Sequence, residues 1–369
     1  MSNSITVLCT LQQKLRFTAL RRGTLYSSVI LILFIIALLP TFSTLYASED
    51  IGSAYMTADL PPILNRPANL PRSLFPFRSY SADSGLGNLA IRRIVQDSTG
   101  FLWVGTEDGL YRYNGDRFTR FDYDNGLPST WITDLLAIPK GGLLVCTPQG
   151  LASQKGGRFE TFKEASGLPD GACNAITRDD QGVIWVAHKD GLYFKPVTAD
   201  RFRRLNNFPI GPANAVVALP KPSSYIFAAS KDLVFRVDNY SIKSCLPVIP
   251  GSVEPIDSLA ADGSGRIWAQ SARRLYSLVP GASRFQDESA ELPTISSGGV
   301  LSTDSAGRLW VPTDEGMSCR IGNTWRHFGS KDGLPTEWTQ YIFEDREKSL
   351  WIGGLGVHRL VGRGEPRRP

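Results

Sequence analysis

The chain has 369 residues, a formal net charge of +5 and three histidines. Residues 1–47 supply +4 of that charge, so the rest of the chain carries +1 and the basic balance gives no support to a nucleic-acid partner. No Ser-His-Asp order, His/Cys metal cluster, Gly-rich phosphate loop or histidine-kinase box can be assembled from the sequence. We therefore expect no catalytic residues, no metal site and no cofactor.

The N-terminal region combines a basic flank with an apolar run. Lys14, Arg16, Arg21 and Arg22 precede the apolar residues 28–47, whose core before Pro40 is about 11 residues long. A full membrane span needs about 20 residues, so residues 1–47 are interpreted as a signal peptide in preference to an N-terminal membrane anchor. Either predicts export to the periplasm or another extracytoplasmic compartment, with the inner membrane as the anchor site in the second case. Residues 48–74 form a Pro-rich linker.

From residue 75 onward a phrase recurs at intervals of 41 or 42 residues, most completely as Asp97 to Tyr111. Its anchor position is held by Trp103, Trp185, Trp268, Trp310 and Trp351, and by Leu144 and Ile226 where tryptophan is missing. Each unit contains four short runs with strand-like alternation, and Asn114-Gly115 is a strong hairpin signal. Units of this kind predict an all-β fold, a seven-bladed β-propeller of four-stranded antiparallel blades, over residues 75–361.

The last unit ends before its fourth strand, and residues 362–369 form a C-terminal tail. The missing strand is found before the first unit. Phe77-Arg-Ser-Tyr80 followed by Gly85-Leu86 matches Phe118-Thr-Arg-Phe121 followed by Gly126-Leu127. We therefore predict that an N-terminal strand completes blade seven and closes the ring.

The phrase Gly-Leu-Pro, an apolar strand, then Asp-x-x-Gly-x-Leu-Trp-Val-Gly-Thr-x-x-Gly-Leu-x-x-Tyr resembles the two-component regulator propeller repeat. The resemblance covers residues from about 75 to 361, and blades two, four and five match less well. Proteins with this repeat are sensor regions of bacterial membrane-bound histidine kinases and related signalling proteins. The resemblance thus implies a sensory input domain with a membrane signalling partner, although no kinase or other output module is found in this sequence.

Candidate binding residues lie where the repeat varies. Loops between second and third strands and the corners after fourth strands are expected on one face of the ring, where ligands enter. Trp131 and Trp338 stand where other blades have mostly small residues, and they flank a strand that begins with Ile91, Arg92 and Arg93. They could stack on a sugar or an aromatic ligand, with arginine pairing an anionic group, or they could plug the channel. The other loop candidates for ligand binding are Glu107, Asp108, His188 and Asp314.

The repeated turn residue Asp97 and its equivalents are interpreted as structural, because such carboxylates accept backbone N–H groups in tight turns. Cys146 and Cys173 fall on adjacent blades and could approach each other. We nevertheless expect four unpaired thiols outside the leader, because a disulfide needs a specific Cα spacing.

The sequence thus predicts an exported, non-catalytic propeller that binds a small molecule, a glycan fragment or an envelope protein. Two alternatives stay open. One is a lyase of the virginiamycin B type, for which the candidate catalytic residues would be His188 with Glu107 or Asp314. The other is a stand-alone envelope interaction scaffold.

Overall fold

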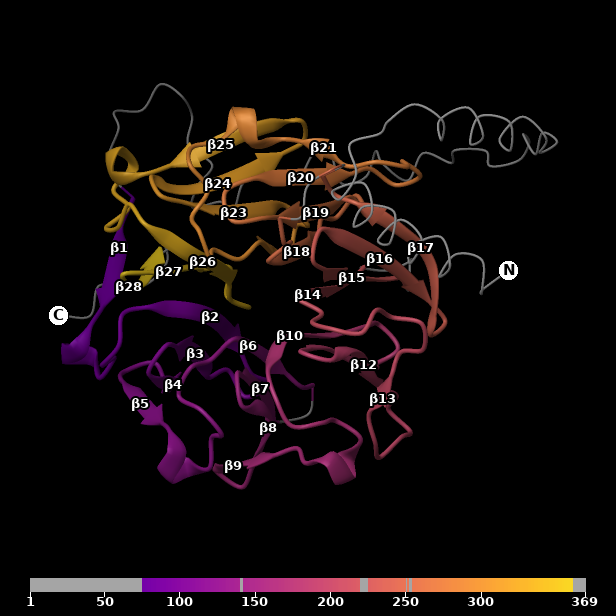
Figure 1. Ribbon diagram of the computed structural model, residues 1–369. Helices are drawn as coiled ribbons and strands as arrows, with labels where there is room; N and C mark the ends of the chain where they lie inside the picture. Colours follow the sequence, from indigo (N-terminus) through magenta and orange to yellow (C-terminus); the bar gives the residue numbers. More distant parts are fainter. Residues whose placement is uncertain (1–74, 140–141, 220–224, 250, 252–253, 361–369) are drawn as a thin grey trace, which may run out of the picture. The chain divides into compact units, whose positions relative to one another are not determined.

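The structure is a computed structural model that describes residues 75–139, 142–219, 225–249, 251 and 254–360. The predicted leader, the linker over 48–74 and the tail over 362–369 lie outside these residues. The described strands form seven four-stranded antiparallel sheets arranged around a central axis, so the predicted seven-bladed propeller is confirmed (Figure 1). Within the described residues, no helix has both the length and the apolarity to cross a bilayer.

Each blade begins with its innermost strand at the axis, and the other three strands follow outward. Blade one has β2 (Ile91–Gln96), β3 (Leu102–Thr106), β4 (Gly109–Tyr113) and β5 (Phe118–Phe121). Blade two has β6 (Asp134–Ala137), β7 (Leu143–Thr147), β8 (Gly150–Lys155) and β9 (Arg158–Thr161). Blade three has β10 (Cys173–Arg178), β11 (Ile184–His188), β12 (Gly191–Lys195) and β13 (Arg203–Arg204). Blade four has β14 (Ala215–Ala218), β15 (Ile226–Ser230), β16 (Leu233–Asp238) and β17 (Ser241–Pro247).

The remaining blades follow the same plan. Blade five has β18 (Ser258–Ala261), β19 (Ile267–Gln270), β20 (Leu275–Leu278) and β21 (Gln286–Asp287). Blade six has β22 (Ser302–Thr303), β23 (Leu309–Thr313), β24 (Gly316–Ile321) and β25 (Thr324–Phe328). Blade seven has β26 (Thr339–Glu344), β27 (Leu350–Gly354), β28 (Gly356–Leu360) and β1 (Phe77–Tyr80). Single 3-10 turns follow several outer strands: η1 (Ala82–Ser84), η2 (Tyr123–Asn125), η3 (Glu164–Ser166), η4 (Ser289–Glu291) and η5 (Ser330–Asp332).

Strand β1 closes the ring, as the sequence predicts. Phe77 pairs with Leu360 and Tyr80 with Val357, and Figure 1 shows indigo β1 beside yellow β28. The Tyr80 side chain is 2% exposed, and its ring stacks on Trp351 with centroids 5.5 Å apart. On its other side Tyr80 contacts Tyr113 of blade one at a centroid distance of 5.1 Å. The strand from before the first repeat therefore joins the last blade to the first.

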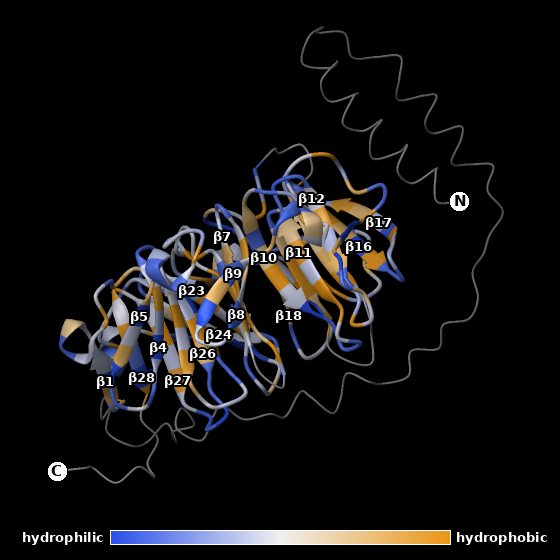
Figure 2. Ribbon diagram, turned by 90° about the horizontal axis from the view of Figure 1, so that it is seen from below, coloured by the Kyte–Doolittle hydropathy of each residue, from blue (hydrophilic) through white to orange (hydrophobic). Residues whose placement is uncertain are grey.

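Gly-Leu corners pack blade seven on blade one, blade one on blade two and blade two on blade three. Gly126 has φ +92°, and a Cβ there would lie 2.2 Å from the carbonyl oxygen of Phe159 on blade two. Only glycine fits both the left-handed backbone and this close approach. Leu127, which follows, is buried in the core between blades one and two. Seen from the side, the strands carry most of the apolar residues and the turns are mostly polar (Figure 2).

The repeated aspartates are structural, as expected, and they bond to the anchor tryptophans as well as to the backbone. Asp97 Oδ1 accepts the N–H groups of Thr99 and Phe101, and its Oδ2 accepts the indole N–H of Trp103 at 2.7 Å. The same indole bond, at 2.7–2.9 Å, joins Asp179 to Trp185, Asp262 to Trp268, Asp304 to Trp310 and Asp345 to Trp351. In blades two and four the aspartate and the tryptophan are both replaced, by Ile138 and Leu144 in blade two and by Pro220 and Ile226 in blade four.

The expectation of four unpaired thiols is wrong, because Cys146 and Cys173 form a disulfide between blades two and three. Their Cα atoms are 5.0 Å apart, inside the range that a disulfide requires. Gly105 and Ile132 stand one repeat earlier and touch in the same way, since a Cβ on Gly105 would lie 2.6 Å from the Ile132 side chain. The repeat thus brings the second strand of one blade against the inner strand of the next, and two cysteines occupy that contact between blades two and three.

Candidate functional site

One face of the ring carries both kinds of loop that the sequence singled out, and we call it the corner face. The turn between β3 and β4 bonds to the corner that leads into blade two, through Gly109 N–H to Thr130 O at 2.8 Å and Ile132 N–H to Thr106 O at 2.9 Å. Blade seven repeats this link, because the Gly356 N–H donates to Leu89 O at 2.9 Å. The predicted grouping of second-to-third turns with corners is therefore correct.

Large apolar side chains are exposed on the corner face at the boundaries of blades seven, one and two. The exposed fractions are 61% for Leu355, 45% for Trp131 and 40% for Leu89. Leu355 forms a β-bridge with Ala90, next to Leu89. Trp338 is half-buried, and its carbonyl oxygen lies 2.2 Å from the position of a Cβ on Gly354, so it adjoins Leu355. Neither Trp131 nor Trp338 lines the pocket that the seven blades form around the central axis, which is described below.

Arg92 and Glu107 supply charge beside these apolar residues. The Arg92 guanidinium lies 3.9 Å from the Glu107 carboxylate, and their side chains are 24% and 40% exposed. Arg92 also donates to the side-chain oxygen of Gln340 on blade seven at 3.3 Å. Burial, and secondarily Arg93, lowers the pKa of Arg92. We refer to Leu89, Arg92, Glu107, Trp131, Trp338 and Leu355 as the corner patch.

Three of the predicted site residues lie outside the corner patch. Asp108 is paired with Arg120 of its own blade at 3.1 Å. Asp314 of blade six is paired with Arg273 of blade five at 3.0 Å. Both ion pairs are partly exposed to solvent and lie outside the corner patch.

His188, the third, is at the end of β11, but its side chain is fully buried and does not reach the corner face. Its Nδ1 accepts the Asp190 N–H at 3.2 Å, and its ring meets Tyr193 edge-on at 5.4 Å. Thr106 and Thr147 occupy the same turn position in blades one and two and accept the equivalent N–H groups. Burial lowers the pKa of His188, with the nearby Asp190 opposing the effect. His188 thus replaces a structural threonine.

Arg93 points away from Arg92, into a pocket in the central channel. The pocket has a volume of about 180 Å³ and is lined by residues of all seven blades. Arg93 Nε donates to Asp134 Oδ1 at 2.7 Å, and both side chains are 12% exposed. Asp134 also accepts the backbone N–H groups of Leu135 and Ile176. Arg93 lies over the ring of Tyr341, with the guanidinium carbon 5.4 Å from the centroid.

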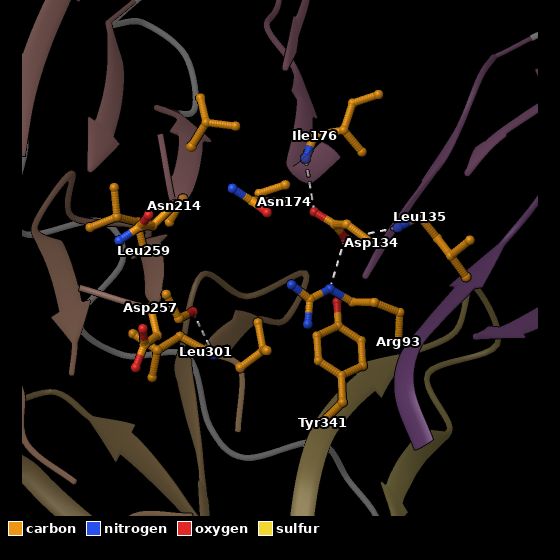
Figure 3. Close-up of a pocket in the computed structure, with 15 residues that line it drawn as sticks. Arg93, Asp134, Leu135, Asn174, Ile176, Asn214, Asp257, Leu259, Leu301 and Tyr341 are labelled. Atoms are coloured by element: carbon orange, nitrogen blue, oxygen red, sulfur yellow. Dashed lines mark hydrogen bonds and ion pairs between the residues drawn. The ribbon is translucent and has the colours of Figure 1, made fainter. Parts of the chain in front are cut away.

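Asp257 and Asn214 lie on the opposite side of this pocket from Arg93 and Tyr341 (Figure 3). Desolvation, together with the like charge of Glu254, raises the pKa of Asp257. Sequence reasoning missed these channel residues because Asn214 and Asp257 belong to blades four and five, where the repeat is degraded. Leu89 was missed too, and Leu355 was not singled out within its loop, although a leucine where most other blades have a small or polar residue is a usable signal. Among the described residues, no group of His, Cys, Asp and Glu side chains forms a metal site.

The repeat itself is matched by a known family. The family model described as two component regulator propeller matches residues 85–108, the corner before blade one through its second-to-third turn. The resemblance drawn from the sequence is thereby confirmed. One copy of the repeat, residues 85–108, thus matches the two-component regulator propeller model.

Solved structures with the same fold include extracellular domains of signalling proteins. The extracellular domain of BT4673 from B. thetaiotaomicron, described as a hybrid two component system, has a TM-score of 0.63 at 19% identity, over 79% of this chain and 40% of that one. The corresponding domain of BT3049 gives 0.63 at 18% identity, over 78% and 42%. Virginiamycin B lyase from Staphylococcus aureus gives 0.60 at 13% identity, over 77% and 98%.

At these identities the structural likeness shows the fold alone. The chain spans about two fifths of the length of the two extracellular domains. No curated protein matches the sequence.

Proposed function

We propose that this propeller is the extracytoplasmic sensory domain of a bacterial signalling system and that it binds its ligand on the corner patch. The family repeat and the extracellular domains that share the fold support the sensory role. Export is supported by the basic and apolar leader and by the Cys146–Cys173 disulfide, because disulfides persist in oxidising compartments. Signal output then depends on a membrane partner or on a further module.

The observation that carries the proposal is the exposure of Trp131, Leu89 and Leu355 around one charged pair. Exposed apolar side chains that gather in one place mark interaction sites more often than singly scattered ones do. A half-exposed indole offers a flat apolar face with an N–H at its edge, which suits stacking on a sugar ring. Arg92 and Glu107 provide donors and acceptors for the hydroxyl groups around such a ring. A glycan fragment is therefore the ligand class that the corner patch fits best.

The test is a thermal-shift screen of the purified protein against glycan fragments, followed by titration of any that raise the melting temperature. Trp131→Ala should weaken binding at least tenfold, equivalent to about 1.4 kcal/mol, with little change in stability. Tyr123→Ala is the matched control, because Tyr123 is an aromatic residue 62% exposed outside the corner patch. A large loss of stability with unchanged binding would instead assign Trp131 to packing. If an envelope protein binds and no glycan does, the corner patch remains the proposed binding site and the ligand class becomes a protein.

A lyase of the virginiamycin B type is the second candidate, because the propeller matches 98% of that enzyme's chain. His188 is buried, while His327 lies on β25 and His358 on β28, so none of the three histidines lines the channel pocket. Turnover of a cyclic depsipeptide in a magnesium-containing assay would favour the lyase. If the protein binds a partner without any effect on signalling, a stand-alone envelope scaffold becomes the better description.

A further inference from the structure

The central channel contains a second polar site that is separate from the corner patch. Asn174, Asn214 and Asp257 lie at the start of the inner strands of blades three, four and five, Asn174 as the second residue of β10 and the other two just before β14 and β18, and all three line the channel pocket. Figure 3 shows Asn214 and Asp257 on one side, Arg93 and Tyr341 on the other, and Asn174 near Asp134. Three adjacent blades thus present two amides and one carboxylate to the same cavity.

The charges that line this pocket are unequal in number. Arg93 and Asp134 form an ion pair at 2.7 Å, and the Asp134 carboxylate also accepts two backbone N–H groups. Asp257 has no such partner, because within the described residues its carboxylate forms no hydrogen bond or ion pair. The side chain is exposed to the channel, yet the walls desolvate it enough to raise its pKa. The pocket therefore has one negative charge without compensation, in a place where a positive charge is favourable.

The side-chain amides of Asn174 and Asn214 also favour a positively charged hydrogen-bond donor. The Asn174 amide nitrogen donates to Ala213 O at 2.8 Å, so its side-chain oxygen remains as an acceptor. The Asn214 side chain forms no hydrogen bond with the described residues and has its own oxygen available. A group with several N–H donors and one positive charge matches one carboxylate and two amide oxygens, and an ammonium group has this chemistry.

The size of the cavity limits the ligand. A cavity of about 150 Å³ holds a six-membered carbon ring. The channel pocket, at about 180 Å³, is slightly larger and opens to solvent. A compact molecule fits within it.

We propose that the channel pocket binds a small organic cation through its ammonium group, with Asp257 as the counter-ion and Asn174 and Asn214 as hydrogen-bond acceptors. This inference does not depend on the corner patch. It gives the propeller a second ligand site of a different chemical class, at the axis where all seven blades meet.

The test is an NMR titration of the isotope-labelled protein with ethanolamine, using ethylene glycol as a neutral probe of the same size. Ethanolamine should give saturable shifts at the amides of Asn214 and Asp257, and ethylene glycol should bind at least tenfold more weakly. Asp257→Asn should weaken ethanolamine binding at least tenfold, and Asn214→Ala several-fold. Asp124→Asn, which removes an exposed carboxylate on η2, is the control and should leave binding unchanged.

Asp257→Asn keeps the shape of the side chain and removes a desolvated charge, so the variant is expected to fold; its melting temperature checks this. Equal binding of both probes, or unchanged ethanolamine binding by a folded Asp257→Asn variant, would overturn the proposal. Absence of any saturable shift would also overturn the proposal and indicate that the pocket is filled by water alone. Potassium ions that compete as well as ethanolamine would reassign the site to an inorganic cation. Loss of glycan binding with intact ethanolamine binding would affect only the corner patch.

Discussion

The Cys146–Cys173 disulfide gives the sharpest quantitative prediction for the fold. The two cysteines are 27 residues apart in sequence, so the crosslink closes a loop between adjacent blades. The loss of loop-closure entropy in the unfolded chain then stabilises the protein by about 3.5 kcal/mol. For a propeller of this size, with an unfolding entropy of about 0.6 kcal/mol per kelvin, this corresponds to about 6 °C in the melting temperature.

The assay compares thermal unfolding of the oxidised protein with that of the Cys146→Ala/Cys173→Ala variant. Both side chains are fully buried, so the double variant also loses packing. Protein refolded in reductant keeps both sulfur atoms and isolates the effect of the crosslink. Peptide mapping without reduction should find Cys146 joined to Cys173. Equal melting temperatures for oxidised and reduced protein, or a map without this link, would refute the reasoning.

Three further outcomes follow from the contacts. A double-mutant cycle of Asp97→Ala and Trp103→Phe should give a coupling energy of about 0.5–3 kcal/mol in urea unfolding, because one buried hydrogen bond joins the pair; additive losses would make the bond negligible. Tyr80→Ala should lower the free energy of unfolding by about 3–5 kcal/mol, since the buried Tyr80 ring joins blades seven and one. A protein that lacks residues 75–86 and melts like the full chain would contradict closure of the ring by β1. Because burial lowers the pKa of His188, the unfolded chain takes up a proton first, and stability falls as the pH drops through the ordinary histidine pKa. His188→Thr should therefore lose less stability between about pH 7.5 and 5.5 than the wild type, and an equal loss in calorimetry would assign the effect to other groups.

The fold was predictable because the repeat encodes it several times over. Asp97 with Trp103 recurs in five blades, and the Phe77–Tyr80 match to Phe118–Phe121 identifies the closing strand. The disulfide was missed although it could have been found. Gly105 and Ile132 stand one repeat before Cys146 and Cys173 and touch, and Gly353 and Ile91 make the same contact between blades seven and one, so the cysteine pair occupies a contact that the ring repeats.

The candidate site was only partly predictable. Trp131 differs from the small residues of other blades, and its exposure agrees with that signal. Arg92 stands at the bulge between Ile91 and Arg93 in the pairing of β2 with β3, with its guanidinium beside Glu107, whereas Arg93 lines the channel pocket. Spacing alone does not reveal such a bulge. The surroundings of Asp257 likewise depend on which side chains the ring brings to the axis.

The central claim is that the corner patch binds the ligand of a sensory domain. The most direct measurement is the affinity of wild-type protein, Trp131→Ala and Tyr123→Ala for a glycan fragment found in the thermal-shift screen. The account predicts at least a tenfold loss for Trp131→Ala and no change for Tyr123→Ala. Equal affinities for all three proteins would contradict it.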